Sequence, residues 1–193
     1  PGLFDGMGLR GNASAPLKAE GVRIPFTALL GEDGQGDMLM NNDELPVFAT
    51  LIASCSIGMM DGALARSAAH ITSSRFAESG GSLSELPTIR AYLARAQIRA
   101  DQARVLRDDT VAAMAAGRAD TMLRVLECKA AAGETATEVT DLAMRVCGGA
   151  AFRNDVGVER HFRDARAATV MAPTTDVLYD FIGKAVTGLP LFG

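Results

Sequence analysis

From about residue 42 onward, apolar and polar residues recur with the period of an α-helix. The first such stretch follows Asp43, a residue type that often caps helix starts, and continues to about Arg75. Its predicted buried face consists of Val47, Leu51, Ser54, Gly58 and Ala65. The pattern therefore predicts one long helix with this face turned inward.

A second predicted helix opens at Leu86-Pro87 and ends at Gly117. Proline suits the first turn, where a missing N–H costs little. The predicted inward positions of this helix are Ile89, Leu93, Ala96, Ala100, Ala103, Leu106, Thr110 and Met114.

Three further helices are predicted, over residues 119–146, over 158–168, and from about 173 to just before Gly188. The first of these stops at Gly148-Gly149, as expected for a glycine cap. Long helices with short connections predict a mainly α fold, an antiparallel up-and-down four-helix bundle.

Residues 1–36 lack a helical period and are rich in Gly and Pro. Within them, residues 17–25 predict a short strand or hairpin edge, and residues 29–36 predict a turn. We expect a short β/loop remnant ahead of the bundle.

Charge and apolar content narrow the class of protein. The net charge is −4 without any basic block, so neither nucleic acid nor an anionic membrane is an expected partner. The most apolar stretch, 49–69, is interrupted by Asp61 and Arg66, so we expect no membrane insertion.

The three cysteines, Cys55, Cys128 and Cys147, are odd in number and lack a Cys-x-x-Cys spacing. This pattern is typical of buried thiols in a cytosolic protein, not of a disulfide framework or a zinc site. We therefore expect a cytoplasmic protein without a metal centre.

Few residues suggest chemistry by type and spacing alone. His70 and His161 have no ligand-like neighbours, so we interpret them as core or surface histidines. A charge cluster on the 158–168 helix is typical of a solvated or ion-paired helix face. Its members are Arg160, Arg163, Asp164 and Arg166.

A series of motifs gives more specific information. Gly8-Leu-Arg-Gly11, Gly21-Val-Arg-Ile-Pro25 and Leu30-Gly-Glu-Asp-Gly-Gln-Gly36 come first. Gly148-Gly149, Val158-Glu-Arg-His-Phe-Arg-Asp-Ala-Arg166 and Met171-Ala-Pro-Thr174 follow. In this order and spacing they resemble the acyl-CoA dehydrogenase superfamily.

The resemblance implies two regions. Residues 1–36 resemble the end of the family's middle β-domain, and residues 37–193 resemble its C-terminal helical bundle. The chain opens at Pro1 without a Met, so we expect a longer protein with further residues upstream. We expect residues 1–193 alone to be inactive and to bind FAD weakly or not at all.

The resemblance also implies FAD between these two regions, with its pyrophosphate contacted by a neighbouring subunit. Arg75 occupies the place of the Arg in the family's Arg-x-x-Phe-Gly motif, although Glu78-Ser79 replaces Phe-Gly. Guanidinium suits a phosphate because it pairs with oxygens in a planar fork. The alternative is an exposed arginine that offsets the helix dipole.

Further positions are similar to the family's cofactor contacts. Arg145 replaces the Gln of a Gln-x-x-Gly-Gly motif whose glycines remain as Gly148 and Gly149. Thr174 matches the Thr of the Tyr-Glu-Gly-Thr loop, and Asp176 lies where Gln or Glu is usual.

The family's catalytic base is absent from both of its usual places. The resemblance puts Ala172 at the Glu of the Tyr-Glu-Gly-Thr loop and Phe48 at the alternative Glu on the first bundle helix. A carboxylate there removes the α-proton of an acyl-CoA thioester. Glu44 lies one turn before Phe48, as a candidate base or simply a helix N-terminal charge.

Three functions remain open at this stage. The protein is an FAD-dependent oxidoreductase that acts on the CH–CH bond of an acyl thioester, a flavin monooxygenase or oxidase on the same fold, or a catalytically silent structural subunit. The resemblance further implies a homodimer or homotetramer.

Overall fold

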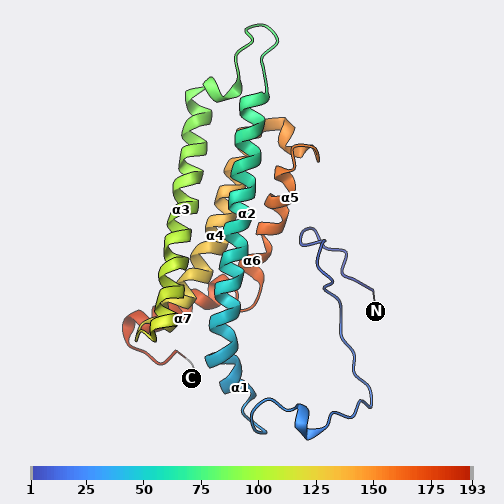
Figure 1. Cartoon of the computed structure of the whole chain (residues 1–193), viewed down its shortest axis with the longest axis vertical. Helices are drawn as coiled ribbons and strands as arrows, with labels where there is room; N and C mark the ends of the chain where they lie inside the picture. Colours follow the sequence, from blue (N-terminus) through green and yellow to red (C-terminus); the bar gives the residue numbers. More distant parts are fainter. Residues whose placement is uncertain (1, 192–193) are drawn as a thin grey trace.

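The computed structural model describes residues 2–191 of the 193-residue chain, and these contain helices but no sheet. Three long helices dominate it: α2 (Leu45–Ser73), α3 (Pro87–Ala116) and α4 (Thr121–Cys147). α5 (Val158–Ala165) runs back beside them, antiparallel to α4 (Figure 1). The predicted mainly α, antiparallel bundle is confirmed.

Two short helices complete the bundle at its lower end in Figure 1, namely α6 (Ala167–Val170) and α7 (Thr175–Thr187). The predicted helix over 158–168 is thus divided into α5 and α6 at Arg166. Because loop 171–174 joins α6 to α7, it lies at this same end of the bundle.

The first helix begins earlier than predicted, so Asp43 is not its N-cap. α1 (Gly36–Leu39) passes through a π-helical turn (Met40–Glu44) directly into α2. No Pro or Gly interrupts residues 37–45, and Asp37 places an acidic side chain in the first turn, where the helix dipole favours it. Asp43 therefore lies inside the helix.

The buried face predicted for this helix is wrong. Val47 and Leu51 are 51% and 59% exposed, whereas Ala49, Ala53 and Ile57 are buried. The helix is apolar on nearly every side, so periodicity could not select the inward face. The buried face is the one that packs against α4.

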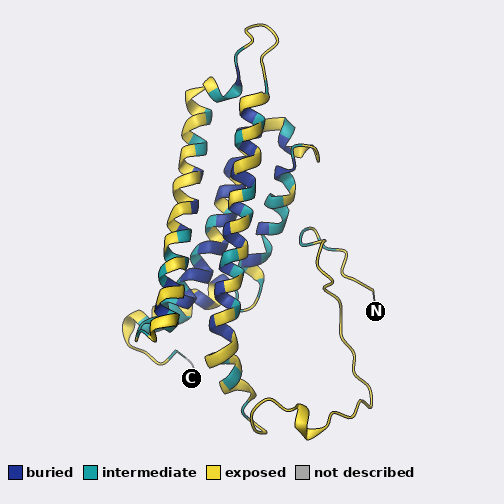
Figure 2. Ribbon diagram, viewed as in Figure 1, coloured by how far each residue is buried: buried dark blue, intermediate teal, exposed yellow. Residues whose placement is uncertain are grey.

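The inward face predicted for α3 is correct. Ala96, Ala100, Ala103 and Thr110 are buried, and Leu93 packs against the same core. Polar residues fill the rest of this helix, so its period is clear in the sequence. Buried residues accordingly line the inside of the bundle in Figure 2.

Glycine ends two helices as the sequence predicts. Gly117 caps α3 with a φ of 59°, and the Arg118 N–H donates to the Ala113 carbonyl oxygen at 3.0 Å. Gly148 ends α4 with a φ of 58°. Pro87 lies in the first turn of α3, also as predicted.

The predicted strand over 17–25 is not formed. Residues 2–35 form no strand, and their one regular element is the 3-10 turn Phe26–Ala28. A strand needs a neighbour for its N–H and C=O groups, and this segment lies outside the bundle, with Leu17 96% exposed. In Figure 2 residues 2–35, which we call the strap, are exposed along almost their whole length.

The strap contacts the bundle at the turn Gly8-Leu-Arg-Gly11. The Leu9 N–H donates to Oδ1 of Asp164 on α5 at 2.6 Å. Gly8 is so close to α5 that a Cβ there would lie 2.6 Å from the Arg163 carbonyl oxygen. Asp164, interpreted from the sequence as part of a solvated or ion-paired helix face, therefore also anchors this turn.

One helix, from Gly36 to Ser73, is long and apolar enough to cross a membrane, judged by length and composition alone. Of its most apolar 18 residues, 44% are buried inside the molecule. The core helix of a bundle meets the same criteria, so this property is weak evidence for a span.

Candidate active site

A pocket of about 710 Å³ lies where the first helix meets loop 171–174 and α7. We call it the 172 pocket. It is lined by Asp37, Met40, Asn41, Glu44, Leu45, Phe48, Ala172, Pro173, Val177, Phe181, Lys184 and Leu191. Its wall is mainly apolar, with two carboxylates and one ammonium group.

The 172 pocket brings together the three residues considered for the base position. Glu44 and Phe48 come from the first helix, one turn apart, and Ala172 comes from the loop ahead of α7. Of these three, only Glu44 has a side chain that can accept a proton.

Glu44 ends the π-helical turn Met40–Glu44, in which the Leu45 N–H donates to the Met40 carbonyl oxygen. Such turns contain an extra residue, are rare, and are frequent at functional sites. Among the described residues, the Glu44 carboxylate makes no hydrogen bond or ion pair. It is therefore open to a ligand.

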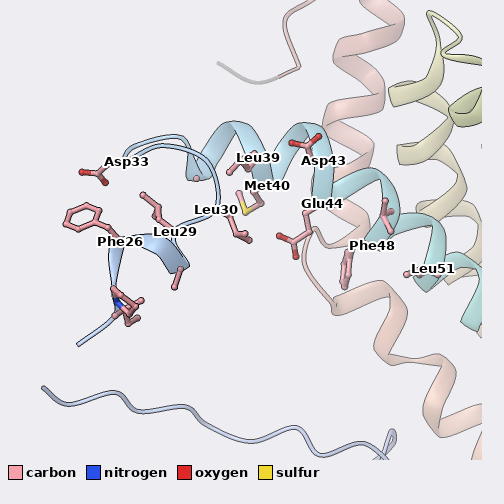
Figure 3. Close-up of a pocket in the computed structure, with 15 residues that line it drawn as sticks. Phe26, Leu29, Leu30, Asp33, Leu39, Met40, Asp43, Glu44, Phe48 and Leu51 are labelled. Atoms are coloured by element: carbon pink, nitrogen blue, oxygen red, sulfur yellow. The ribbon is translucent and has the colours of Figure 1, made fainter. Parts of the chain in front are cut away.

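A second hollow, the outer groove, shares Met40, Glu44 and Phe48 with the 172 pocket. It has a volume of about 1340 Å³ and separates the strap from the first helix. In Figure 3 Glu44 and Phe48 extend from the same side of the helix, whereas Asp43 extends from the other. Glu44 therefore stands on the wall between the two hollows.

Lys129 of α4 supports the loop behind the 172 pocket. This lysine is 1% exposed, and its Nζ donates to the carbonyl oxygens of Met171 at 3.0 Å and Pro173 at 2.6 Å. Burial lowers the pKa of Lys129 below its ordinary value. Ala172 lies between the two residues whose carbonyl groups Lys129 binds.

Sequence reasoning missed Lys129. The signal was present, because Lys129 falls between Cys128 and Ala130 in the middle of a helical stretch whose apolar positions predict burial. A lysine on a buried face needs partners, and these carbonyl groups are distant in sequence.

The candidate phosphate contact Arg75 lies at the opposite, upper end of the bundle in Figure 1, just after α2. Its backbone pairs with Ser82 in an isolated antiparallel bridge. Its Nη1 is 3.9 Å from Oε1 of Glu85, and its side chain is 59% exposed. The guanidinium group is held loosely and faces solvent.

Arg145, Gly148 and Gly149 lie at this same end, where α4 stops. Arg145 Nε is 3.6 Å from Oδ2 of Asp141, and its guanidinium carbon is 6.0 Å from the ring centre of Tyr92. A Cβ added at either glycine would meet no atom within 4 Å. The backbone there is open to a ligand.

Thr174 and Asp176 lie at the lower end, at the start of α7. The first hydrogen bond of that helix runs from the Leu178 N–H to the Thr174 carbonyl oxygen at 2.9 Å. The N–H groups ahead of Leu178 thus have no partner within the helix, and the Thr174 hydroxyl makes no capping bond. Such an end suits an anion, although Asp176 adds a negative charge to it.

The structure therefore divides the candidate cofactor residues into two groups. The stretch of α4 from Lys129, beside loop 171–174, to Arg145 is about 24 Å long at the rise of an α-helix. The two groups form separate candidate sites on one chain, and only the lower group adjoins the 172 pocket.

The remaining charged cluster on α5 has structural partners. Arg160 pairs with Asp164 at 3.5 Å, and Arg163 pairs with Glu159 at 3.7 Å. The Arg166 guanidinium lies over the ring of Phe162, with 4.6 Å to the ring centre. None of these residues lines the 172 pocket.

Comparison with known proteins gives the family. Residues 35–187 match the family described as acyl-CoA dehydrogenase, C-terminal domain. The chain belongs to the acyl-CoA dehydrogenase family.

Relatives within this family include the short-chain specific mitochondrial acyl-CoA dehydrogenase of Homo sapiens. It is 30% identical over 173 residues, which cover 90% of this chain and 41% of that protein. The acryloyl-CoA reductase (NADH) of Anaerotignum propionicum is 28% identical over 180 residues, which cover 93% of this chain and 45% of that protein.

Butyryl-CoA dehydrogenase of Megasphaera elsdenii shares the fold, with a TM-score of 0.88 at 24% identity over 95% of this chain and 47% of that chain. The chain thus spans less than half the length of these acyl-CoA dehydrogenase relatives.

Proposed function

We propose that the intact protein is an FAD-dependent oxidoreductase that acts on the CH–CH bond of an acyl thioester. The observation that carries this proposal is the 172 pocket, in a chain of the acyl-CoA dehydrogenase family. The pocket places a carboxylate beside the two positions at which the family resemblance expects a base.

The apolar wall of the 172 pocket suits an acyl chain. Leu45 and Phe48 line one side, and Val177 and Phe181 line the other. Burial of a hydrocarbon chain between them would contribute about 0.8 kcal/mol for each CH₂ group removed from water. These side chains would also exclude water from the carbon that loses its proton.

Glu44 is the proposed general base. Neither Ala172 nor Phe48 can accept a proton, and Glu44 is on the same helix face as Phe48, one turn earlier. Its carboxylate would take the proton from the carbon next to the thioester carbonyl. FAD, when bound, supplies the acceptor for the hydride from the neighbouring carbon.

The chain's residues fit FAD when two copies contribute. The unpaired N–H groups at the start of α7 and the Thr174 hydroxyl would hold phosphate oxygens of one cofactor. Arg75, Arg145 and the open backbone at Gly148-Gly149 would contact the cofactor of a neighbouring copy. This agrees with the division of these residues between two ends.

The experiment is turnover of the intact protein with acyl-CoA substrates and an artificial electron acceptor. Glu44→Gln is expected to lower kcat by about 100-fold or more, since removal of a general base costs that much. Asp43→Asn is the matched control, because Asp43 neighbours Glu44 but does not line the 172 pocket. Full activity in Glu44→Gln protein would overturn this role.

The absence of a carboxylate at Ala172 and Phe48 favours a second candidate, a flavin monooxygenase or oxidase on the same fold. Anaerobic addition of acyl-CoA separates the two, because only a dehydrogenase substrate would bleach the flavin absorption directly. A colourless intact protein that binds no flavin would instead indicate a structural subunit.

A further inference from the structure

Lys129 is a buried ammonium group whose contacts all lie on one short loop. It is 1% exposed, and its two hydrogen bonds reach the carbonyl oxygens of Met171 and Pro173. Among the described residues, no carboxylate forms an ion pair with it. Its charge is therefore balanced by the dipoles of these two carbonyl groups.

A buried charge of this kind is costly to desolvate, and a well-packed apolar side chain is often at least as stabilising. Packing alone therefore does not account for a lysine at this position. The geometry of its contacts accounts for the lysine, because each hydrogen bond is charge-assisted and the two bonds fix two points on the same loop.

The two bonded carbonyl groups flank Ala172. With the carbonyl oxygens of 171 and 173 turned toward α4, residue 172 forms part of the pocket wall.

We propose that Lys129 is a positioning residue, which holds loop 171–173 so that residue 172 lines the pocket and which places a positive charge behind that wall. Through this charge, the pocket beside residue 172 favours a negatively charged group. Position 172 owes its importance to the proposed function. The effect of Lys129 on this loop can be measured without catalytic activity.

The test introduces a thiol at position 172 of the intact protein. Ala172→Cys is combined with Cys55→Ser, because Cys55 is exposed whereas Cys128 and Cys147 are buried. The rate at which iodoacetamide alkylates the introduced thiol is then measured against pH. The thiolate reacts, so the profile reports the access to residue 172 and the charges around it. These charges are Lys129 behind the wall and, within the pocket, Asp37, Glu44 and Lys184, which stay the same in every variant compared.

Lys129→Met removes both donors and the charge at similar size. It is expected to lower the alkylation rate at pH 7 by about threefold or more and to move the profile to higher pH, because a nearby cation favours the thiolate. Lys129→Arg keeps the charge and is expected to keep the profile near that of the parent. A merely structural lysine would not shift the pH profile.

An unchanged rate and pH profile in Lys129→Met protein would overturn the proposal. If that variant does not fold, Lys129→Gln gives the same test, because its amide still donates to a carbonyl oxygen but carries no charge. The readout requires neither flavin nor substrate. Failure of the Glu44 experiment would thus reject the proposed function and leave this measurement intact.

Discussion

At the scale of single residues, His161 on α5 makes the stability of the fold depend on pH. Its pKa is lowered, chiefly by burial and then by the guanidinium groups of Arg66 and Arg160, while Asp164 and Glu159 act weakly in the opposite sense. The folded protein therefore prefers the neutral ring.

The lowered pKa of His161 makes the folded protein less stable at low pH. The pKa of a histidine in an unfolded chain is about 6.5. The stabilisation that depends on the neutral His161 ring is therefore fully present above that pH, and it is lost as the pH falls through the lower pKa of the folded state. We expect the free energy of unfolding in urea to decrease between about pH 7 and pH 5, and His161→Gln to flatten this slope. An equal slope in both proteins would contradict the assignment.

The sequence named three residues that the structure brings together, and their roles in a site stay predictions. Ala172, Phe48 and Glu44 were singled out by family resemblance, and the structure places all three on one pocket. Lys129 was not, because its partners lie 42 and 44 residues away in sequence. Contacts of that range depend on how α4 meets loop 171–174, which no local pattern encodes.

At the scale of helices, Gly62 determines how closely α5 approaches α2. A Cβ at this position would lie 2.5 Å from the His161 ring carbon Cε1. We expect Gly62→Ala to lower the free energy of unfolding by about 1–3 kcal/mol, because the ring or the helix must move. Urea denaturation followed by circular dichroism measures this change.

Gly58 on the same helix provides the control. A Cβ there would meet no atom within 4 Å. Gly58→Ala should therefore raise stability by about 0.5–1 kcal/mol, as expected for a helix interior. Equal effects of the two substitutions would show that helix propensity, and not the contact with His161, governs position 62.

The sequence predicted which segments are helical better than it predicted which face of each helix is buried. The inward face of α3 was correct because charged residues mark its outer side, whereas α2 is apolar on nearly every side and its predicted face is exposed. The start at Asp43 was wrong because no Pro or Gly lies in residues 37–45, and the helix continues upstream to Gly36. The strand over 17–25 has no neighbour in the described residues with which to pair.

At the scale of the whole molecule, the proposed function predicts that copies of the chain associate, because Arg75 and Thr174 lie at opposite ends of the bundle. We expect a homodimer or homotetramer by light scattering at micromolar concentration.

Arg75→Ala is expected to lower the flavin content of the intact protein, because each charge-assisted contact is worth about 1.5–3 kcal/mol. Arg95→Ala, an exposed change on α3, is the control. A monomer with full flavin content would contradict this arrangement.

The two-ended bundle also has a consequence for mixtures of normal and altered chains. In an assembly of the proposed kind, each copy completes its own cofactor site at one end and a neighbour's site at the other. A single chain with substitutions at both ends would therefore impair two sites, one of them on an unaltered subunit. When altered and unaltered chains are made together in one cell, loss of activity would exceed the fraction of altered chains, which is the pattern that geneticists describe as dominant interference.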